Sequence, residues 1–262
     1  MVYTSRFVMA GHSMSRRIPS DFNRGELRPP ARWELLREAR VVSEFLSAWA
    51  RSPRLVRSVP HGRGETVMVV PGFASGDAST ARLRGFLKSI GYGAFGWGLG
   101  RNNGNVPRLI PDVMAQTERL AAKHGAPVRL VGWSLGGYLV REVARERPEL
   151  VDRVITLGAP IVGGPSYTAT AAMYVRKGYD LEGIKATVLE RERRPITVPI
   201  FVVYSRSDGI VAWRACIDTY RNPRVEHHEV SSTHLGLVRS PRVLRLVADL
   251  LARSTGGTGS RA

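Results

Sequence analysis

The chain has 262 residues, 43% hydrophobic and 23% charged, and can therefore form a large core without disulfides or metal ions. Its single cysteine, Cys216, excludes an intrachain disulfide and a cysteine-based zinc cluster. No apolar run approaches the roughly 18 residues of a membrane helix, and no secretion signal is visible, so a cytoplasmic protein is expected.

The charge is strongly positive, with 39 basic residues against 22 acidic ones and a net charge of +17. The excess lies at both ends of the chain. In residues 1–64, for example, 12 arginines stand against 5 acidic residues. A field of this sign attracts anionic surfaces, so a membrane surface is a candidate partner, although solvated basic tails are the simpler interpretation. No specific nucleic-acid partner is expected, since no basic stripe is interleaved with aromatic residues.

The first 63 residues are expected to form a basic segment and one helix. Residues 1–30 show no periodicity, and Pro29 and Pro30 close that stretch. An apolar stripe at helical spacing then runs over residues 32–50 and predicts a helix that packs on the main domain. The stripe includes Trp33, Leu36, Val41, Phe45 and Trp49.

Short apolar strands then alternate with helices over residues 64–253, and the Gly-, Ser- and Thr-rich residues 254–262 are expected to form a flexible tail. This alternation predicts an α/β domain with a mostly parallel sheet flanked by helices. The expected strands are 66–71, 92–97, 128–133, 151–157, 198–204 and 224–230, and the expected helices are 80–90, 107–124 (or from Pro111), 135–147 and 241–252.

Residues 163–195 interrupt this alternation. The segment is much longer than an ordinary connection between a helix and a strand, and it contains a predicted helix over 168–176 and a charged second half. It is therefore interpreted as a small lid inserted between two strands.

The central motif is Gly132-Trp133-Ser134-Leu135-Gly136, which fits G-x-S-x-G. Ser134 stands where an apolar strand meets a helix, which is the context that this motif requires. The flanking glycines allow a sharp turn, and the helix N-terminus favours a developing negative charge. Ser134 is the predicted nucleophile.

A serine nucleophile requires a base, usually a histidine held by a carboxylate in the chain order Ser, acid, His. His234 follows the last strand and Asp208 follows the strand before it, so both should lie at the same sheet edge as Ser134. His227 and His228 are weaker candidates for the base. Glu226 and Asp218 are weaker candidates for the acid.

An oxyanion hole requires two backbone donors. One is expected to be the amide of Leu135, directly after the nucleophile. The other is expected in the loop after the first strand of the domain, Val70-Pro71-Gly72-Phe73-Ala74, where Phe73 is the first candidate and Ala74 the second.

These residues resemble the α/β-hydrolase superfamily over about residues 64–252, with the closest likeness to bacterial lipase- and esterase-like members. The likeness rests on Pro71-Gly72-Phe73, the turn at Ser134, Leu157-Gly158-Ala159-Pro160, Asp208-Gly209 and His234. It implies the α/β-hydrolase fold, an oxyanion donor after Pro-Gly and a lid after the Gly-Ala-Pro strand end. The calcium-binding aspartates of some secreted lipases are lacking, so neither a metal nor another cofactor is expected.

The sequence thus predicts a serine carboxylester hydrolase that forms an acyl-enzyme on Ser134 and acts on a small-molecule or lipid ester. Trp133, Tyr167, Met173 and Trp213 are candidates to line an acyl pocket, together with Phe73. Two alternatives stay open at this stage. The same triad would serve an acyltransferase or a thioesterase, and a non-catalytic protein of this fold could bind anionic surfaces.

Overall fold

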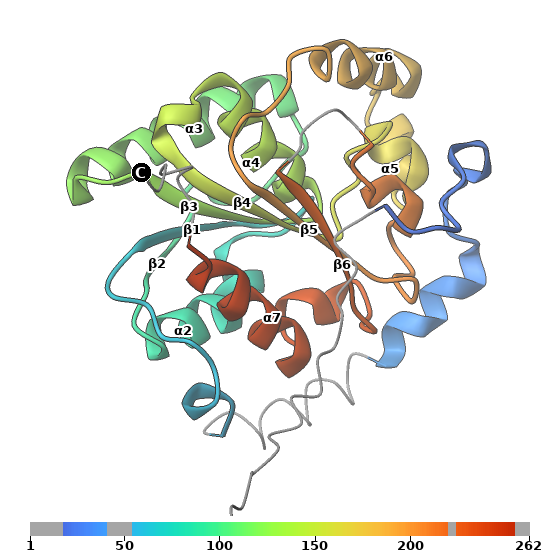
Figure 1. Cartoon of the computed structure of the whole chain (residues 1–262). Coiled ribbons are helices and arrows are strands. Elements are labelled where there is room, and N and C mark those ends of the chain that lie inside the picture. Colours follow the sequence, from blue (N-terminus) through green and yellow to red (C-terminus); the bar gives the residue numbers. More distant parts are fainter. Residues whose placement is uncertain (1–17, 41–53, 220–223, 255–262) are drawn as a thin grey trace, which may run out of the picture.

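The computed structural model describes residues 18–40, 54–219 and 224–254, and it contains a six-stranded sheet in the order β2-β1-β3-β4-β5-β6 (Figure 1). Every neighbouring pair of strands is parallel, so the predicted parallel sheet is confirmed. The strands are β1 (Thr66–Val70), β2 (Gly93–Gly96), β3 (Val128–Trp133), β4 (Val151–Leu157), β5 (Ile200–Tyr204) and β6 (Val225–Glu229).

Helices cover both faces of the sheet, α2 and α7 on one face and α3 and α4 on the other (Figure 1). The main helices are α2 (Ala81–Ser89), α3 (Val106–His124), α4 (Leu135–Glu146), α5 (Ala171–Arg176), α6 (Leu181–Arg191) and α7 (Pro241–Ala252). Short 3₁₀ helices are η1 (Arg24–Glu26), η2 (Arg32–Arg40), η3 (Asp77–Thr80), η4 (Pro148–Leu150), η5 (Gly164–Tyr167), η6 (Trp213–Cys216) and η7 (Leu235–Val238). Residues 54–57 are also helical.

Two apolar cores hold the layers together, one on each face of the sheet. Strands β1, β3 and β4 are buried almost throughout, because both of their faces are covered by helices. Alternate side chains of one strand therefore enter different cores: Val67 and Val69 pack with α2 and α7, while Met68 and Val70 pack with α3 and α4.

The predicted helix over 32–50 differs from the structure in its described part. Residues 32–40 form a 3₁₀ helix rather than an α-helix, and residues 41–53 lie outside the described residues. Trp33 and Leu36 are 59% and 75% exposed, whereas Glu38 is buried. With three residues per turn instead of 3.6, the stripe read at α-helical spacing does not form one inward face.

The segment between β4 and β5 contains η5, α5 and α6. Its predicted helix over 168–176 begins at Ala171, and the charged second half forms α6. Helices α5 and α6 lie together beyond the carboxyl ends of the central strands (Figure 1). Within the described residues, no helix combines the length and the apolar character needed to cross a membrane.

Candidate active site

Ser134 occupies a sharp, strained turn between β3 and α4. Its φ of 55° and ψ of −125° lie in a region that residues with side chains rarely adopt. The turn is held by a hydrogen bond from the Ser134 amide to Leu157 O at 2.9 Å. A Cβ at Gly132 would collide with the Gly136 carbonyl, and one at Gly136 with the Val70 carbonyl. The glycines at both positions are thus required by close backbone approach.

Asp208 and His234 meet at the same edge of the sheet. Asp208 Oδ2 lies 2.7 Å from His234 Nδ1, and both side chains are buried. The other oxygen, Oδ1, accepts hydrogen bonds from the amides of Ile210 at 2.9 Å and Val211 at 2.7 Å. The carboxylate is therefore fixed in orientation, and it can hold the imidazole with Nε2 directed away from it.

Two contacts bring this pair close to Ser134. A Cβ at Gly158 would lie 3.0 Å from Asp208 Oδ2 and 3.2 Å from His234 Nδ1, so the pair lies directly beside Gly158. Gly158 follows Leu157, whose carbonyl oxygen accepts the hydrogen bond from the Ser134 amide. The ring of Trp133, which precedes Ser134, packs at a tilt against the His234 imidazole, with ring centroids 5.3 Å apart. The structure shows no hydrogen bond between Ser134 Oγ and His234 Nε2, both of which it describes. Such bonds often tighten only when substrate binds.

The two predicted oxyanion donors lie beside Ser134. A Cβ at Gly72 would be 3.0 Å from Ser134 Cβ. The loop that contains Phe73 therefore lies directly against the serine. In the described chain the amides of Phe73 and Leu135 donate no hydrogen bond to protein atoms. The second candidate, Ala74, is excluded as a donor because its amide already bonds Asn102 O at 2.7 Å.

Asn102 is a supporting residue that sequence reasoning missed. It is completely buried, and its Nδ2 donates to Pro71 O at 3.0 Å. Its backbone amide donates to Ser75 O at 2.8 Å, so it binds the loop of residues 71–75 on both sides of Phe73; this loop is called the oxyanion loop below, after its predicted donor. Asn102 was visible in the sequence only as one of several polar residues in a glycine-rich loop.

An apolar cavity of about 430 Å³ opens beside Ser134. This volume lies within the range of small-molecule sites. Its wall comes from the oxyanion loop, the start of α3, the first turn of α4 and the segment with η5, α5 and α6. The lining includes Phe73, Val106, Leu135, Tyr138, Tyr174, Tyr179, Ile184 and Val188.

The tyrosines of the cavity act as apolar walls with neutral hydroxyl groups. Burial raises the pKa of both Tyr138 and Tyr174. The Tyr174 ring lies against Phe73, with centroids 4.5 Å apart, so α5 contacts the oxyanion loop directly.

Four residues predicted to line an acyl pocket lie elsewhere. Trp133 is buried in the core under α7, and Tyr167 packs against Gly163 and does not line the cavity. Trp213 stacks on Tyr204, with centroids 5.8 Å apart. Met173 is on α5, but the next residue, Tyr174, is the one that lines the cavity. Neighbouring residues of a helix point in different directions, so the rotation of α5 about its axis decides whether Met173 or Tyr174 faces the cavity, and the sequence does not show that rotation.

The weaker candidates for acid and base have other partners. Asp218 pairs with Arg141 at 2.5 Å, and Glu226 pairs with Arg253. His227 Nε2 accepts a hydrogen bond from the Asp218 amide at 3.0 Å. Burial lowers the pKa of His227 and keeps this ring neutral.

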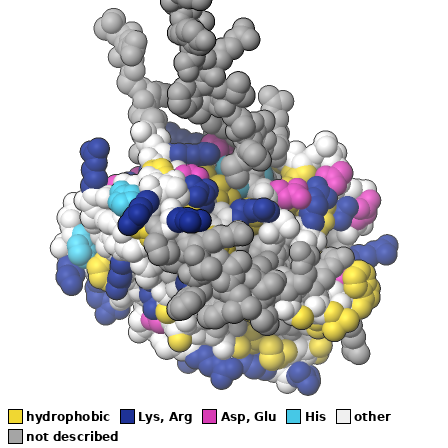
Figure 2. Space-filling view, turned by 90° about the horizontal axis from the view of Figure 1, so that it is seen from below, with side chains coloured by type: hydrophobic (Ala, Val, Ile, Leu, Met, Phe, Trp, Pro, Cys, Tyr) yellow, Lys and Arg dark blue, Asp and Glu magenta, His cyan; other side chains and the backbone are white. Residues whose placement is uncertain are grey.

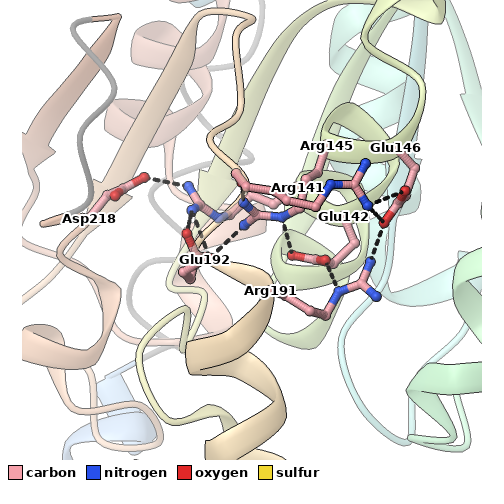
Figure 3. A network of polar contacts seen from close by, with 8 residues as sticks. Arg141, Glu142, Arg145, Glu146, Arg191, Glu192 and Asp218 are labelled. Atoms are coloured by element: carbon pink, nitrogen blue, oxygen red, sulfur yellow. Dashed lines mark hydrogen bonds and ion pairs between the residues drawn. The ribbon is translucent and has the colours of Figure 1, made fainter.

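A buried ion network connects α6 to α4, the helix that begins after Ser134 (Figure 3). Arg141 is completely buried and bonds Asp218 on one side and Glu192 on the other, at 2.5 and 3.2 Å. Glu192 also accepts from Arg145 at 2.7 Å. The charges compensate each other, and the two acidic residues raise the pKa of Arg141 against the effect of its burial.

The same network continues along α4 to the last turn of α6. Arg191 bonds Glu142, and it also bonds Glu146 at 2.9 Å. Because α6 supplies Ile184 and Val188 to the cavity wall, the network fixes that wall relative to the helix of the candidate nucleophile.

The positive charge does not gather at one place on the face seen in Figure 2. There the Lys and Arg side chains are distributed around the described surface, with Asp and Glu among them on one side. Several arginines elsewhere are paired, such as Arg206 with Asp21 at 2.6 Å and Arg129 with Asp152 at 2.9 Å.

The known proteins to which this chain is similar agree with the fold described above. No family model matches the chain. The chain is 23% identical over 198 residues to the mitochondrial palmitoyl-protein thioesterase ABHD10 of Bos taurus, and the match covers 63% of this chain and 64% of that protein. The chain thus spans less than two thirds of the length of this relative.

Solved structures share the arrangement of the sheet and helices. Mouse alpha/beta hydrolase domain-containing protein 10 aligns with a TM-score of 0.53 and 20% identity, over 71% of this chain and 87% of that one. A structure of the metagenome-derived lipolytic enzymes LipS and LipT aligns with a TM-score of 0.58 and 16% identity, over 73% and 94%. At these identities, the likeness establishes the fold.

Proposed function

We propose that this chain, which has the α/β-hydrolase fold, is a serine hydrolase that cleaves carboxylic esters through an acyl-enzyme on Ser134. One observation carries the proposal. Ser134 lies in a strained turn on the wall of an apolar cavity, beside two amides that bond no acceptor in the described part of the chain and close to the bonded Asp208–His234 pair. Strain of about 1–3 kcal/mol at one residue is typical of functional sites.

Each residue has a defined role in the proposed reaction. His234 removes the proton from Ser134 Oγ as the oxygen attacks the acyl carbon, and Asp208 stabilises the resulting imidazolium. The amides of Phe73 and Leu135 bind the oxyanion. His234 then protonates the leaving alcohol, and a water molecule, activated by the same imidazole, releases the acid.

The cavity favours an acyl group that is mainly hydrocarbon. Its walls are aromatic and aliphatic, and they adjoin Ser134 directly, so the acyl chain can be buried while the leaving group stays at the opening. We propose residues 163–195 as a lid over this cavity, since α5 and α6 form its outer wall.

Thioesters are the second candidate substrates. The named activity of the bovine relative is removal of a palmitoyl group from protein, and the same acyl-enzyme would form from a thioester. The apolar cavity suits either substrate, because both deliver the same acyl group to Ser134. Paired oxyester and thioester substrates with identical acyl chains would separate the two activities.

Labelling with a fluorophosphonate probe tests the proposal. We expect modification of Ser134 alone, loss of labelling in Ser134→Ala, and unchanged labelling in Ser79→Ala, whose hydroxyl bonds Gly76 O away from the cavity. Untreated wild-type protein should hydrolyse p-nitrophenyl esters from C2 to C16, and labelling with the probe should abolish this activity. Folded protein that neither reacts nor hydrolyses esters, even with detergent or lipid, but binds anionic vesicles would favour the non-catalytic alternative. Product analysis with added alcohols would distinguish hydrolysis from acyl transfer.

A further inference from the structure

A buried carboxylate from the N-terminal segment lies between the loops that carry Asp208 and His234. Glu38 is on η2 and only 9% exposed, whereas Trp33 and Leu36 on the same helix are largely exposed. The charged side chain is therefore the one that faces the protein. A buried carboxylate is stable only when hydrogen bonds or positive charges compensate it.

Backbone amides of both loops supply this compensation. Glu38 Oε1 accepts hydrogen bonds from the amides of Gly209 at 3.0 Å and His234 at 2.9 Å. Oε2 accepts from the amide of Leu235 at 3.1 Å. Gly209 directly follows Asp208, so a single carboxylate joins the two loops within one residue of the Asp208–His234 hydrogen bond.

The glycine at position 209 permits this approach. A Cβ there would collide with the backbone carbonyl of Glu34 and lie 3.3 Å from Glu38 Oε1. The Asp208-Gly209 pair therefore does more than form a turn. It leaves space for η2 to reach the loop of the candidate acid.

We propose that Glu38 is a positioning residue of the active site, which fixes the distance between the Asp208 and His234 loops and so the orientation of the imidazole toward Ser134. This inference rests on the proposed function and deepens it. Because the amides of Gly209 and His234 share one carboxylate oxygen, the loops cannot separate without losing a charge-assisted hydrogen bond. The N-terminal segment thereby becomes part of the catalytic apparatus.

Kinetics of three variants test this role. Glu38→Ala removes every acceptor, while Glu38→Gln keeps one carbonyl oxygen for Gly209 and His234. Asp21→Asn is the matched control, because Asp21 joins the same segment to Arg206 through exposed contacts at 2.6 and 2.7 Å. We expect kcat to fall about 100-fold in Glu38→Ala with little change in KM, less in Glu38→Gln, and hardly at all in Asp21→Asn. Unchanged kcat in folded Glu38→Ala would overturn the proposal.

A double-mutant cycle separates positioning from a general structural effect. In Asp208→Asn the carboxylate that selects the Nδ1–H tautomer of the imidazole is gone, so the position of the ring matters little and the further change Glu38→Ala should reduce kcat only slightly. If the two losses multiply in full, Glu38 does not act through the Asp208–His234 pair, and the proposal fails.

A spectroscopic measurement gives a readout that does not depend on activity. The 15N chemical shifts of the His234 ring, assigned with His234→Asn, report which nitrogen carries the proton. We expect one form, protonated at Nδ1, in the wild type and Asp21→Asn, and a mixture in Glu38→Ala. Identical spectra in all three would overturn the role of Glu38. A single Nδ1–H form, lost in Glu38→Ala, together with no labelling of Ser134, would contradict only the proposed function.

Discussion

The indole N–H of Trp133 donates a hydrogen bond to the backbone carbonyl oxygen of His234 at 3.1 Å. The residue before the candidate nucleophile therefore holds the backbone of the candidate base, while its ring packs at a tilt against the imidazole. Trp133 was predicted to line an acyl pocket. It instead connects β3 to the loop after β6.

Trp133→Phe should remove this hydrogen bond and keep an aromatic ring at the buried position. The loss of one neutral hydrogen bond is expected to lower the free energy of unfolding by about 1 kcal/mol. It should also lower kcat about tenfold, because the imidazole becomes less well placed relative to Ser134. Chemical denaturation and steady-state kinetics on a p-nitrophenyl ester measure the two effects. A stability loss with wild-type kcat would show that the bond serves folding alone.

The backbone strain at Ser134 gives a prediction about stability. Ser134→Gly should relieve the unfavourable φ of 55°, whereas Ser134→Ala keeps it. We expect Ser134→Gly to be more stable than Ser134→Ala by about 1 kcal/mol, although both lack activity. Ala74→Gly is a matched comparison, since Ala74 is the other described non-glycine residue with positive φ, at 58°. Equal unfolding midpoints for both Ser134 variants would mean that the turn is not strained.

Much of the fold was predictable because β1, β3, β4 and β5 are short apolar runs, each with a glycine or proline directly beside one end. Burial of both sheet faces makes these runs almost continuous in β1, β3 and β4. Parallel strands also bring the residues after them to one edge, and this explains why Asp208 and His234 could be named together. Their catalytic roles, and that of Ser134, stay predictions.

The supporting residues were not predictable because their partners are distant in the chain. Glu38 bonds residues about 170 to 200 positions away, and nothing in its local sequence identifies them. Phe73 was named as a lining residue and does line the cavity, but most of the wall was missed, because the sequence did not show that Tyr174 rather than Met173 faces the cavity. The 3₁₀ form of η2 changed the buried face of the N-terminal helix.

Asn102 should support both stability and the oxyanion loop. Asn102→Ala leaves the buried Pro71 carbonyl and the Gly104 amide without their side-chain partner, which should lower the free energy of unfolding by about 1–3 kcal/mol. We expect kcat to fall about tenfold or more as Phe73 loses its position. The control is Asn103→Ala, an exposed neighbour whose side chain accepts only from the Asn105 amide. Similar kcat values in both variants would contradict the role of Asn102.

Asp218→Asn should lower the free energy of unfolding more than the loss of an exposed ion pair does, because Asp218 belongs to the buried ion network of Figure 3. The change leaves the Arg141 guanidinium partly uncompensated in a fully buried site, with an expected loss of about 3–5 kcal/mol in the free energy of unfolding. Glu182→Gln, which removes an exposed pair with Lys185, should leave the free energy of unfolding almost unchanged. Denaturant titrations of both variants provide the comparison. A small loss in Asp218→Asn would mean that Glu192 alone compensates Arg141.

His227 should make the folded state sensitive to acid. Burial lowers its pKa below the ordinary value of about 6.5, and protonation of Nε2 would also break the hydrogen bond from the Asp218 amide. Below about pH 6.5 the unfolded chain therefore binds a proton that the folded chain does not. Stability from this group is complete above that pH, and it is lost as the pH falls toward the lowered folded-state pKa.

His227→Gln keeps an acceptor for the Asp218 amide but cannot titrate. We expect its Tm to fall less than that of the wild type between pH 7.5 and pH 5.5. The control His124→Gln removes an exposed histidine at the end of α3 and should keep the wild-type pH dependence. Thermal unfolding followed by circular dichroism across this range measures all three proteins. Arg141, the arginine that acts on His227, stays charged throughout this range, so parallel curves for His227→Gln and the wild type would assign the acid sensitivity to other groups.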